Sequence, residues 1–316
     1  MDANKTAILA EKIAANVGKV IFGKRRECGL VICALLCRGH ILLDDIPGTG
    51  KTSLAKAVAL SIDASCARVQ FTPDLLPSDI TGINYFNQKS GEFVLRRGPV
   101  FTNILIADEI NRATPRTQSA LLECMEERQA TIDGISYPIE APFMVLATQN
   151  PIESLGTFPL PEAQKDRFLM RLCLGYPDRK SEERMLQEHM KSSPLADLTP
   201  VCTRADIEQA ADEVTSVSVC DDVRGYIMSL IEATRQSEKL RLGASPRATL
   251  ALMHASQAWA AINGRDFVLP DDVKAVARAV LAHRVIPRTQ SRVTAADSAE
   301  SVIDYILDTT PAPING

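Results

Sequence analysis

The feature that most restricts the fold of this chain is a glycine-containing loop between an apolar run and a helix-forming stretch. The loop, Asp45–Thr52 (DIPGTGKT), follows the apolar run His40–Leu43. Its glycines let the backbone curl until successive amide groups point inward, and the helix that starts at Lys51 adds the positive end of its dipole. Strand, loop, lysine, threonine and helix in this order predict a phosphate-binding loop of the Walker A type, although Asp45 replaces the first glycine of that pattern.

This loop predicts ATP and Mg²⁺ as cofactors. Lys51 would contact the β- and γ-phosphates, and the hydroxyl of Thr52 would ligate magnesium. The other interpretation is a plain glycine turn in front of a helix, which would bind nothing. We expect the phosphates to be held by a run of neighbouring residues, Pro47, Gly48, Thr49, Gly50, Lys51, Thr52 and Ser53.

A second motif supplies acidic groups. The apolar run Ile104–Ala107 ends in two carboxylates, Asp108 and Glu109, which is a Walker B arrangement. Asp108 would hold the magnesium ion through its waters, and Glu109 would polarise the attacking water as a general base. In isolation, a solvated strand end would look the same. A protein that only binds nucleotide does not need Glu109, so the pair predicts hydrolysis of ATP.

Short apolar runs alternate with helical stretches up to about Tyr176, whereas only helical spacing follows Pro177. The first part therefore predicts a parallel sheet buried on both faces between helices. The expected strands are His40–Leu43, Ala67–Phe71, Ile104–Ala107, Phe143–Thr148 and Leu169–Leu174. The expected later helices are Arg179–Met190, Arg204–Val214, Asp222–Gln236, Pro246–Ile262 and Pro270–His283. We expect an α/β nucleotide-binding core over residues 1–177 and a smaller all-α lid over 178–316.

The composition restricts the partners and the cellular compartment that we expect for the protein. With 316 residues and 46% hydrophobic content the chain can bury a large core, and its net charge of −4 makes nucleic acid an unlikely main partner. The longest apolar run, Cys28–Cys37, is too short to span a membrane. The eight cysteines form no C-x-x-C pair, so buried thiols in a reducing cytoplasm are preferred to a metal site on Cys33 and Cys37.

Several ordered segments resemble the MoxR family of AAA+ ATPases, and the similarity covers nearly the whole chain. The matching segments are Gln70–Asp79, Asp108–Ala113, Gln118–Leu122, Met125–Glu127, Ala147–Pro151, Leu160–Gln164, Asp166–Phe168 and Gly243–Arg247. The resemblance implies an AAA+ P-loop core followed by a helical lid, and assembly into a homo-oligomer, a hexameric ring.

The resemblance also implies further site residues. Asn150 resembles sensor 1, which positions the attacking water; a turn before a proline is the alternative. Arg167 resembles the arginine finger that reaches the γ-phosphate of a neighbouring subunit, with Arg171 as the rival finger and a surface ion pair with Asp166 as the alternative. Arg247 resembles sensor 2, extending to the phosphates of its own subunit, or else is solvated at the start of a helix. Phe22 and Gly23 resemble the stretch that packs on the adenine, with Leu186 closing the other side.

Two insertions match the family in position. Asp133-Gly134 favours a type I′ turn between Gln129–Ile132 and Ile135–Ile139, just before the sensor 1 strand. The segment Asp79–Gly98 matches the helix 2 insertion and contains an expected strand at Phe93–Leu95. Such insertions often face the pore of a ring or the client protein; simple loop elaborations are the alternative.

The resemblance implies a chaperone-like motor that remodels or helps to mature a protein partner with a von Willebrand factor A domain. Two other functions are open. A motor that acts on nucleic acid is disfavoured by the acidic balance of the chain and by the lack of a recognisable helix-turn-helix. A nucleotide-gated scaffold with little turnover is disfavoured by the complete set of Asp108, Glu109, Asn150 and Arg167.

Overall fold

The computed structural model describes residues 3–149, 157–190, 194–288 and 298–313. Its centre is a five-stranded sheet in the order β2-β5-β8-β1-β9, with every neighbouring pair parallel. The strands are β1 (Ile41–Asp44), β2 (Cys66–Gln70), β5 (Ile104–Asp108), β8 (Met144–Gln149) and β9 (Met170–Leu172). All five predicted strands are present. Because the strands are parallel, their carboxyl ends lie together at one edge of the sheet.

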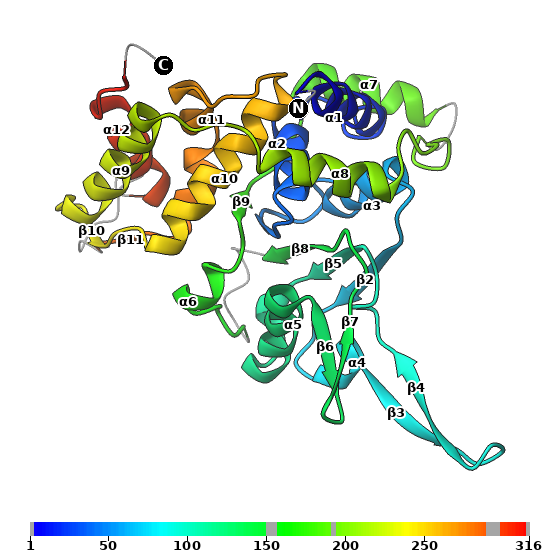
Figure 1. Cartoon of the computed structure of the whole chain (residues 1–316). Coiled ribbons are helices and arrows are strands. Elements are labelled where there is room, and N and C mark those ends of the chain that lie inside the picture. Colours follow the sequence, from blue (N-terminus) through cyan, green and yellow to red (C-terminus); the bar gives the residue numbers. More distant parts are fainter. Residues whose placement is uncertain (1–2, 150–156, 191–193, 289–297, 314–316) are drawn as a thin grey trace.

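Both faces of the sheet are covered by helices, as predicted (Figure 1). Alternate residues of β5 point to opposite faces: Ile104 and Ile106 belong to one buried apolar cluster, Leu105 and Ala107 to the other. The first face carries α1 (Ala3–Val17), α2 (Arg25–Leu36), α3 (Lys51–Ser61) and α8 (Arg204–Val214). The second carries α4 (Pro77–Thr81) and α5 (Pro115–Glu127), with the short 3₁₀ helix η1 (Ile110–Arg112) before α5.

The chain beyond the sheet is mainly helical. Its helices are α7 (Arg179–His189), α9 (Asp221–Gln236), α10 (Pro246–Ile262), α11 (Pro270–Leu281) and α12 (Ala299–Thr309). The expectation that strands stop after Pro177 is wrong, because β10 (Leu240–Leu242) pairs with β11 (Ile286–Pro287) in an antiparallel ladder. Two- and three-residue strands carry too few side chains to show a period of two in the sequence.

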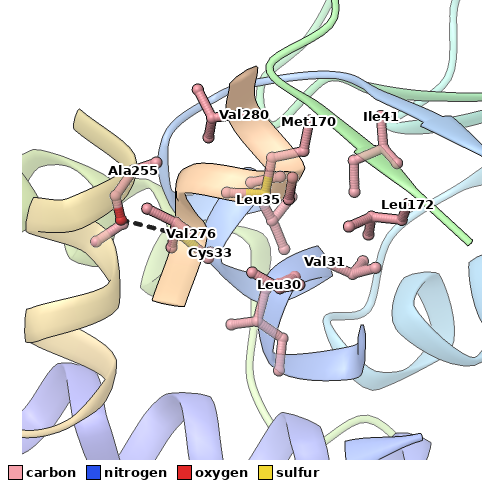
Figure 2. Packing of buried hydrophobic residues seen from close by; sticks show 14 of the residues in the cluster. Leu30, Val31, Cys33, Leu35, Ile41, Met170, Leu172, Ala255, Val276 and Val280 are labelled. Carbon is pink, nitrogen blue, oxygen red and sulfur yellow. Dashed lines mark hydrogen bonds between the residues drawn. The ribbon is translucent and has the colours of Figure 1, made fainter. Parts of the chain in front are cut away.

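Helix α2 lies between the sheet and the lid helices. Figure 2 shows Leu35 of α2 among Ile41 of β1, Met170 of β9 and Val280 of α11, all of them buried. The thiol of Cys33 donates a hydrogen bond to the carbonyl of Ala255 in α10, at 3.3 Å. The lid is thus packed on the core through one continuous apolar cluster. The division at residue 177 stays a prediction.

Two β-hairpins project from the core side by side (Figure 1). One joins β3 (Gly82–Asn87) to β4 (Glu92–Arg97), and the other joins β6 (Gln129–Ile132) to β7 (Ile135–Pro138). Asp133 and Gly134 both have positive φ, 51° and 80°, as the predicted type I′ turn requires. Within the described ranges, no helix is both long and apolar enough to cross a bilayer.

Candidate nucleotide-binding site

A cavity of about 390 Å³ opens at the carboxyl edge of the sheet. It collects residues from the loop after β1 and from the ends of β2, β5 and β8, which is the edge where ligands bind in open α/β sheets. Its lining residues are Pro47, Gly48, Gly50, Lys51, Thr52, Ser53, Arg68, Gln70, Asp108, Glu109, Thr148 and Gln149. The cavity therefore brings together the predicted phosphate loop and the predicted acidic pair.

The loop curls as the sequence predicted. Gly48 and Gly50 have φ of 84° and 86°, which a residue with a side chain rarely adopts. Helix α3 then begins at Lys51, so its free amide groups face the cavity. The Lys51 ammonium donates to the carbonyls of Asp45 (2.9 Å) and Ile46 (2.7 Å), which holds it over the loop.

Asp45 has a structural role at the position where the Walker A pattern has a glycine. Its carboxylate is buried and accepts hydrogen bonds from the amides of Leu174 (2.9 Å) and Gly175 (3.0 Å), just past β9. The other oxygen accepts from the amide of Ile46 at 2.8 Å. These bonds tie the start of the loop to the segment just past β9, so Asp45 anchors the loop at this position.

Asp108 and Glu109 are placed by the last residues of β5 and β8. The hydroxyl of Thr148 donates to Asp108 Oδ1 at 3.1 Å and accepts from the amide of Glu109 at 2.9 Å. Glu109 has a φ of 55°, a left-handed conformation that is uncommon for glutamate and occurs at functional sites. The turn directs the two carboxylates into the same cavity.

Two site residues on β2 were missed in the sequence. Arg68 Nε lies 2.6 Å from Asp108 Oδ2, and Gln70 Nε2 lies 2.7 Å from Glu109 Oε2. The register pairs Gln70 with Asp108 across β2 and β5, so alternate β2 side chains meet the acidic pair. Two polar residues spaced by two in an expected strand were the available signal. Arg112 also contacts Glu109, at 2.9 Å.

The donor atoms suit magnesium. Asp108 offers a carboxylate and Thr52 a hydroxyl at the cavity wall that also carries Lys51. Mg²⁺ binds through one or two protein oxygens, with waters and substrate phosphates completing its shell. The described residues hold no group of three or more histidine, cysteine, aspartate or glutamate side chains that would form an all-protein metal cage. The set fits a magnesium ion that arrives with nucleotide.

The residues predicted to contact the adenine, Phe22, Gly23 and Leu186, lie outside the lining of this cavity. Phe22 is buried, and the guanidinium of Arg184 on α7 lies 5.1 Å from its ring centre. A side chain at Gly23 would clash with Ser181, so the start of α7 packs directly on this turn. Leu186 is 63% exposed. None of Phe22, Gly23 and Leu186 lines the cavity, and Arg184 is the α7 residue that meets Phe22.

Arg167 and Arg247 lie together, at a different place from the cavity. Glu126, at the end of α5, is 3.1 Å from Arg167 and 2.6 Å from Arg247. The carbonyl of Met125, the residue before Glu126, accepts a hydrogen bond from the ring of His40, which lies just before the first residue of β1. The amide of Leu169, just before β9, donates to the carbonyl of His40. Both bonds are therefore at the amino ends of the strands. The two arginines are therefore at the amino edge of the sheet.

In this structure Arg247 pairs with Glu126 and does not line the cavity, which differs from the expectation that it reaches the phosphates of its own subunit. The four residues of β1 separate the two edges by roughly 13 Å at about 3.3 Å per residue. The rival finger, Arg171, is occupied within its own chain by Asp44 and by Glu300 of α12. Asn150 lies outside the described residues.

The sheet order, the phosphate loop and the acidic pair together define a P-loop ATPase domain with a helical lid. Residues 40–170 match the family model of the ATPase family associated with various cellular activities (AAA), and residues 232–304 match the AAA lid domain. A crystal structure of a candidate ATPase from Cytophaga hutchinsonii superposes with a TM-score of 0.88 and 37% identity, covering 98% of this chain and 97% of that one.

Two relatives resolve the family further. Protein YeaC of Bacillus subtilis (strain 168) is 44% identical, covering 97% of this chain and 95% of its own. The chaperone MoxR1 of Mycobacterium tuberculosis is 38% identical, covering 96% of this chain and 82% of its own. The chain belongs to the MoxR family of AAA+ ATPases.

Proposed function

We propose that this protein hydrolyses ATP between the subunits of a hexameric ring and uses the cycle to remodel a partner protein. The observation that carries the proposal is the placement of two groups of residues at opposite edges of one sheet. The phosphate loop with Asp108 and Glu109 lies at the carboxyl edge, and Arg167 with Arg247 at the amino edge. Head-to-tail contacts in a closed ring would join one edge to the other and complete a site.

Within one subunit the residues at the carboxyl edge would bind and orient the reactants. Lys51 would hold the β- and γ-phosphates, while Thr52 and Asp108 would hold Mg²⁺, which neutralises charge on those phosphates when bound. Glu109 would accept a proton from the attacking water. Gln70 hydrogen-bonds Glu109 and would orient it (2.7 Å). Asn150 is proposed to position the same water.

The neighbouring subunit would supply two cations. Arg167 and Arg247 are 33% and 50% exposed, so both can meet a neighbour once they leave Glu126. The γ-phosphate carries more charge than one carboxylate and would compete for both guanidinium groups. The same exchange would couple nucleotide state to the lid, because Arg247 is in the first turn of lid helix α10.

The client side of the proposal rests on the two hairpins and on the family. Phe93 and Phe86 pack edge to face on the β3–β4 hairpin and are 74% and 54% exposed. Exposed aromatic side chains on a projecting arm are typical of protein-binding surfaces. One relative is named a chaperone. We propose that the client carries a von Willebrand factor A domain and that the protein acts in the cytoplasm, where its free thiols would stay reduced.

Subunit mixing tests the shared site. Lys51→Ala destroys the carboxyl-edge group and Arg167→Ala the amino-edge group, so each variant alone should be nearly inactive. Mixed rings contain interfaces with an intact phosphate loop facing an intact Arg167, and activity should return. If mixed rings form, as shown by co-purification of two tags, yet stay inactive, the shared site is refuted.

A separate experiment tests the client. Glu109→Gln should retain ATP and hold the ring in its bound state, so purified von Willebrand factor A domains can be tested for ATP-dependent binding to it. Replacement of Phe86 and Phe93 by serine in the same background should abolish that binding. If the double variant still binds the von Willebrand factor A domain, the β3–β4 hairpin is not part of the client-binding site.

A further inference from the structure

Arg284 is a buried cation that clamps the segment carrying Arg167. Its side chain is 3% exposed, and it lies between the end of α11 and β11. Nε donates to the carboxylate of Asp166 at 2.6 Å, and the terminal nitrogens donate to the carbonyls of Phe168 (2.7 Å) and Leu169 (2.8 Å). The remaining bonds go to the carbonyls of Asp166 (3.2 Å) and Val280. All five N–H groups of the guanidinium therefore have a partner.

The same network reaches Arg247. Asp166 also accepts a hydrogen bond from the hydroxyl of Ser245 at 3.2 Å. Ser245 is the N-cap of α10, and Arg247 is the second residue of that helix. Glu126 then joins the two arginines from the opposite side. Arg284 and Asp166 thus join the backbone segment that carries Arg167 to the start of the helix that carries Arg247.

The burial of the Arg284 charge is explained by the geometry of its hydrogen bonds. Taking a guanidinium out of water costs free energy, and a well-packed apolar residue in its place is often neutral or stabilising. An apolar residue could not bond the carbonyls of Asp166, Phe168 and Leu169 together with the Asp166 carboxylate, whereas the rigid guanidinium fork can. The backbone of residues 166–169 includes Arg167, so the guanidinium fork of Arg284 sets the direction in which the Arg167 side chain points from the backbone.

We infer that Arg284 is a positioning residue for the two arginines supplied to the neighbouring site, linking the lid to the direction of Arg167. This inference rests on the proposed shared site. A misplacement of about 1 Å at a reacting group lowers turnover by up to roughly a hundredfold. Arg284→Lys keeps the charge but has three donors on a flexible stem, so it should loosen Arg167 without removing it.

The test uses full-length variants in the mixing scheme. Arg284→Lys alone should bind a non-cleavable ATP analogue with unchanged affinity and keep its KM, while kcat falls about ten- to a hundredfold. Mixed with Lys51→Ala, it should regain activity, because it contributes a sound phosphate loop. Mixed with Arg167→Ala, it should not, because both variants lack a working amino edge. The double variant Arg284→Lys, Arg167→Ala should be no slower than Arg167→Ala.

Arg265→Lys is the matched control. Arg265 is a partly buried lid arginine that pairs with Asp272 and does not line the cavity, and its variant should keep full turnover. If Arg284→Lys does not fold, as judged by its melting temperature, Asp166→Asn takes its place in the same mixtures.

Three outcomes decide the question. Recovery with Lys51→Ala but not with Arg167→Ala supports the inference. If neither variant restores activity, while Arg167→Ala still complements Lys51→Ala, then Arg284→Lys has a general defect. That outcome overturns the positioning role of Arg284 and leaves the shared site in place. If Arg167→Ala and Lys51→Ala do not complement each other, the shared site itself fails.

Discussion

Asp108 has a cation beside it before any metal arrives. Arg68 lies 2.6 Å from Asp108 Oδ2, and the remaining oxygen accepts from Thr148. An ion pair that is partly exposed, as Arg68 is, contributes up to about 1 kcal/mol. If Asp108 holds Mg²⁺ as proposed, Arg68 and the ion would compete for one carboxylate.

Arg68→Gln should therefore lower the magnesium concentration for half-maximal nucleotide binding by about two- to fivefold, the equivalent of that ion pair. Titration of Mg²⁺ at fixed ADP, followed by a fluorescent nucleotide, measures the shift. Arg179→Gln is the control, because Arg179 is almost fully exposed and pairs only with its helix neighbour Glu183 among the bonds described. A higher magnesium requirement for Arg68→Gln would show that Arg68 contacts the nucleotide.

Lys51 and Glu109 should separate binding from turnover. Lys51→Ala should lose tight ATP binding, because the polyphosphate loses its main cationic contact at the loop. Glu109→Gln should keep binding while turnover falls by roughly two to four orders of magnitude, the range for a positioned base. Equilibrium binding and phosphate release measure the two effects, and identical behaviour of both variants would contradict the assigned roles.

Two elements are held to their neighbours by buried histidines. His40 joins β1 to α5 by donating to Met125 O, and its other nitrogen accepts from the amide of Val145. Burial lowers its pKa to about 4 from the ordinary 6.5. His283 donates to the carbonyl of Phe168, and burial lowers its pKa well below the ordinary value. Both rings are therefore neutral in the folded protein at pH 7.

The pH dependence of stability follows from these lowered pKa values. Below about pH 6.5 the unfolded chain takes up protons that the folded chain refuses, so the free energy of unfolding falls as pH falls. Each histidine contributes a slope of roughly 1.4 kcal/mol per pH unit; for His40 this slope ends near pH 4. Urea unfolding at pH 7 and pH 5 measures it. His40→Gln should have the smaller difference, and an equal difference would contradict the neutral ring.

The β3–β4 hairpin should be functional surface with little stabilising effect. Phe93 is 74% exposed, whereas Phe71, just past β2, is fully buried. Phe93→Ala should change the free energy of unfolding by less than about 1 kcal/mol, and Phe71→Ala should cost about 3–5 kcal/mol. Urea unfolding distinguishes them. A large loss for Phe93→Ala would mean that the arm packs on the core.

At the scale of the whole molecule, the proposed shared site would make activity depend on assembly. A lone subunit would have the phosphate loop, Asp108 and Glu109 but not the Arg167 of a neighbour, and an arginine supplied in this way is worth roughly three to five orders of magnitude in rate. Specific activity should therefore rise with protein concentration, and a non-cleavable ATP analogue should favour the oligomer in sedimentation. Constant specific activity of a species that sediments as a monomer would contradict this.

Local sequence determined the parts that depend on neighbouring residues. The loop Asp45–Thr52, the strand ending in Asp108 and Glu109, and the turn at Asp133-Gly134 were all predicted, because turn geometry and strand periodicity are set within a few residues. The five-stranded sheet followed from the same patterns. The short pair β10–β11 did not, because so short a ladder has no period to detect.

Only the tertiary structure decided which distant residues meet. Arg68 joins Asp108 through the register of β2 on β5, and Glu126 gathers Arg167 and Arg247, which are 80 residues apart. The family resemblance singled out Arg247 and implied a contact with the phosphates of its own subunit. The packing of α10 on the core puts it at the other edge. Side-chain types specify what chemistry is available, whereas strand register and helix packing fix the distances over which it acts.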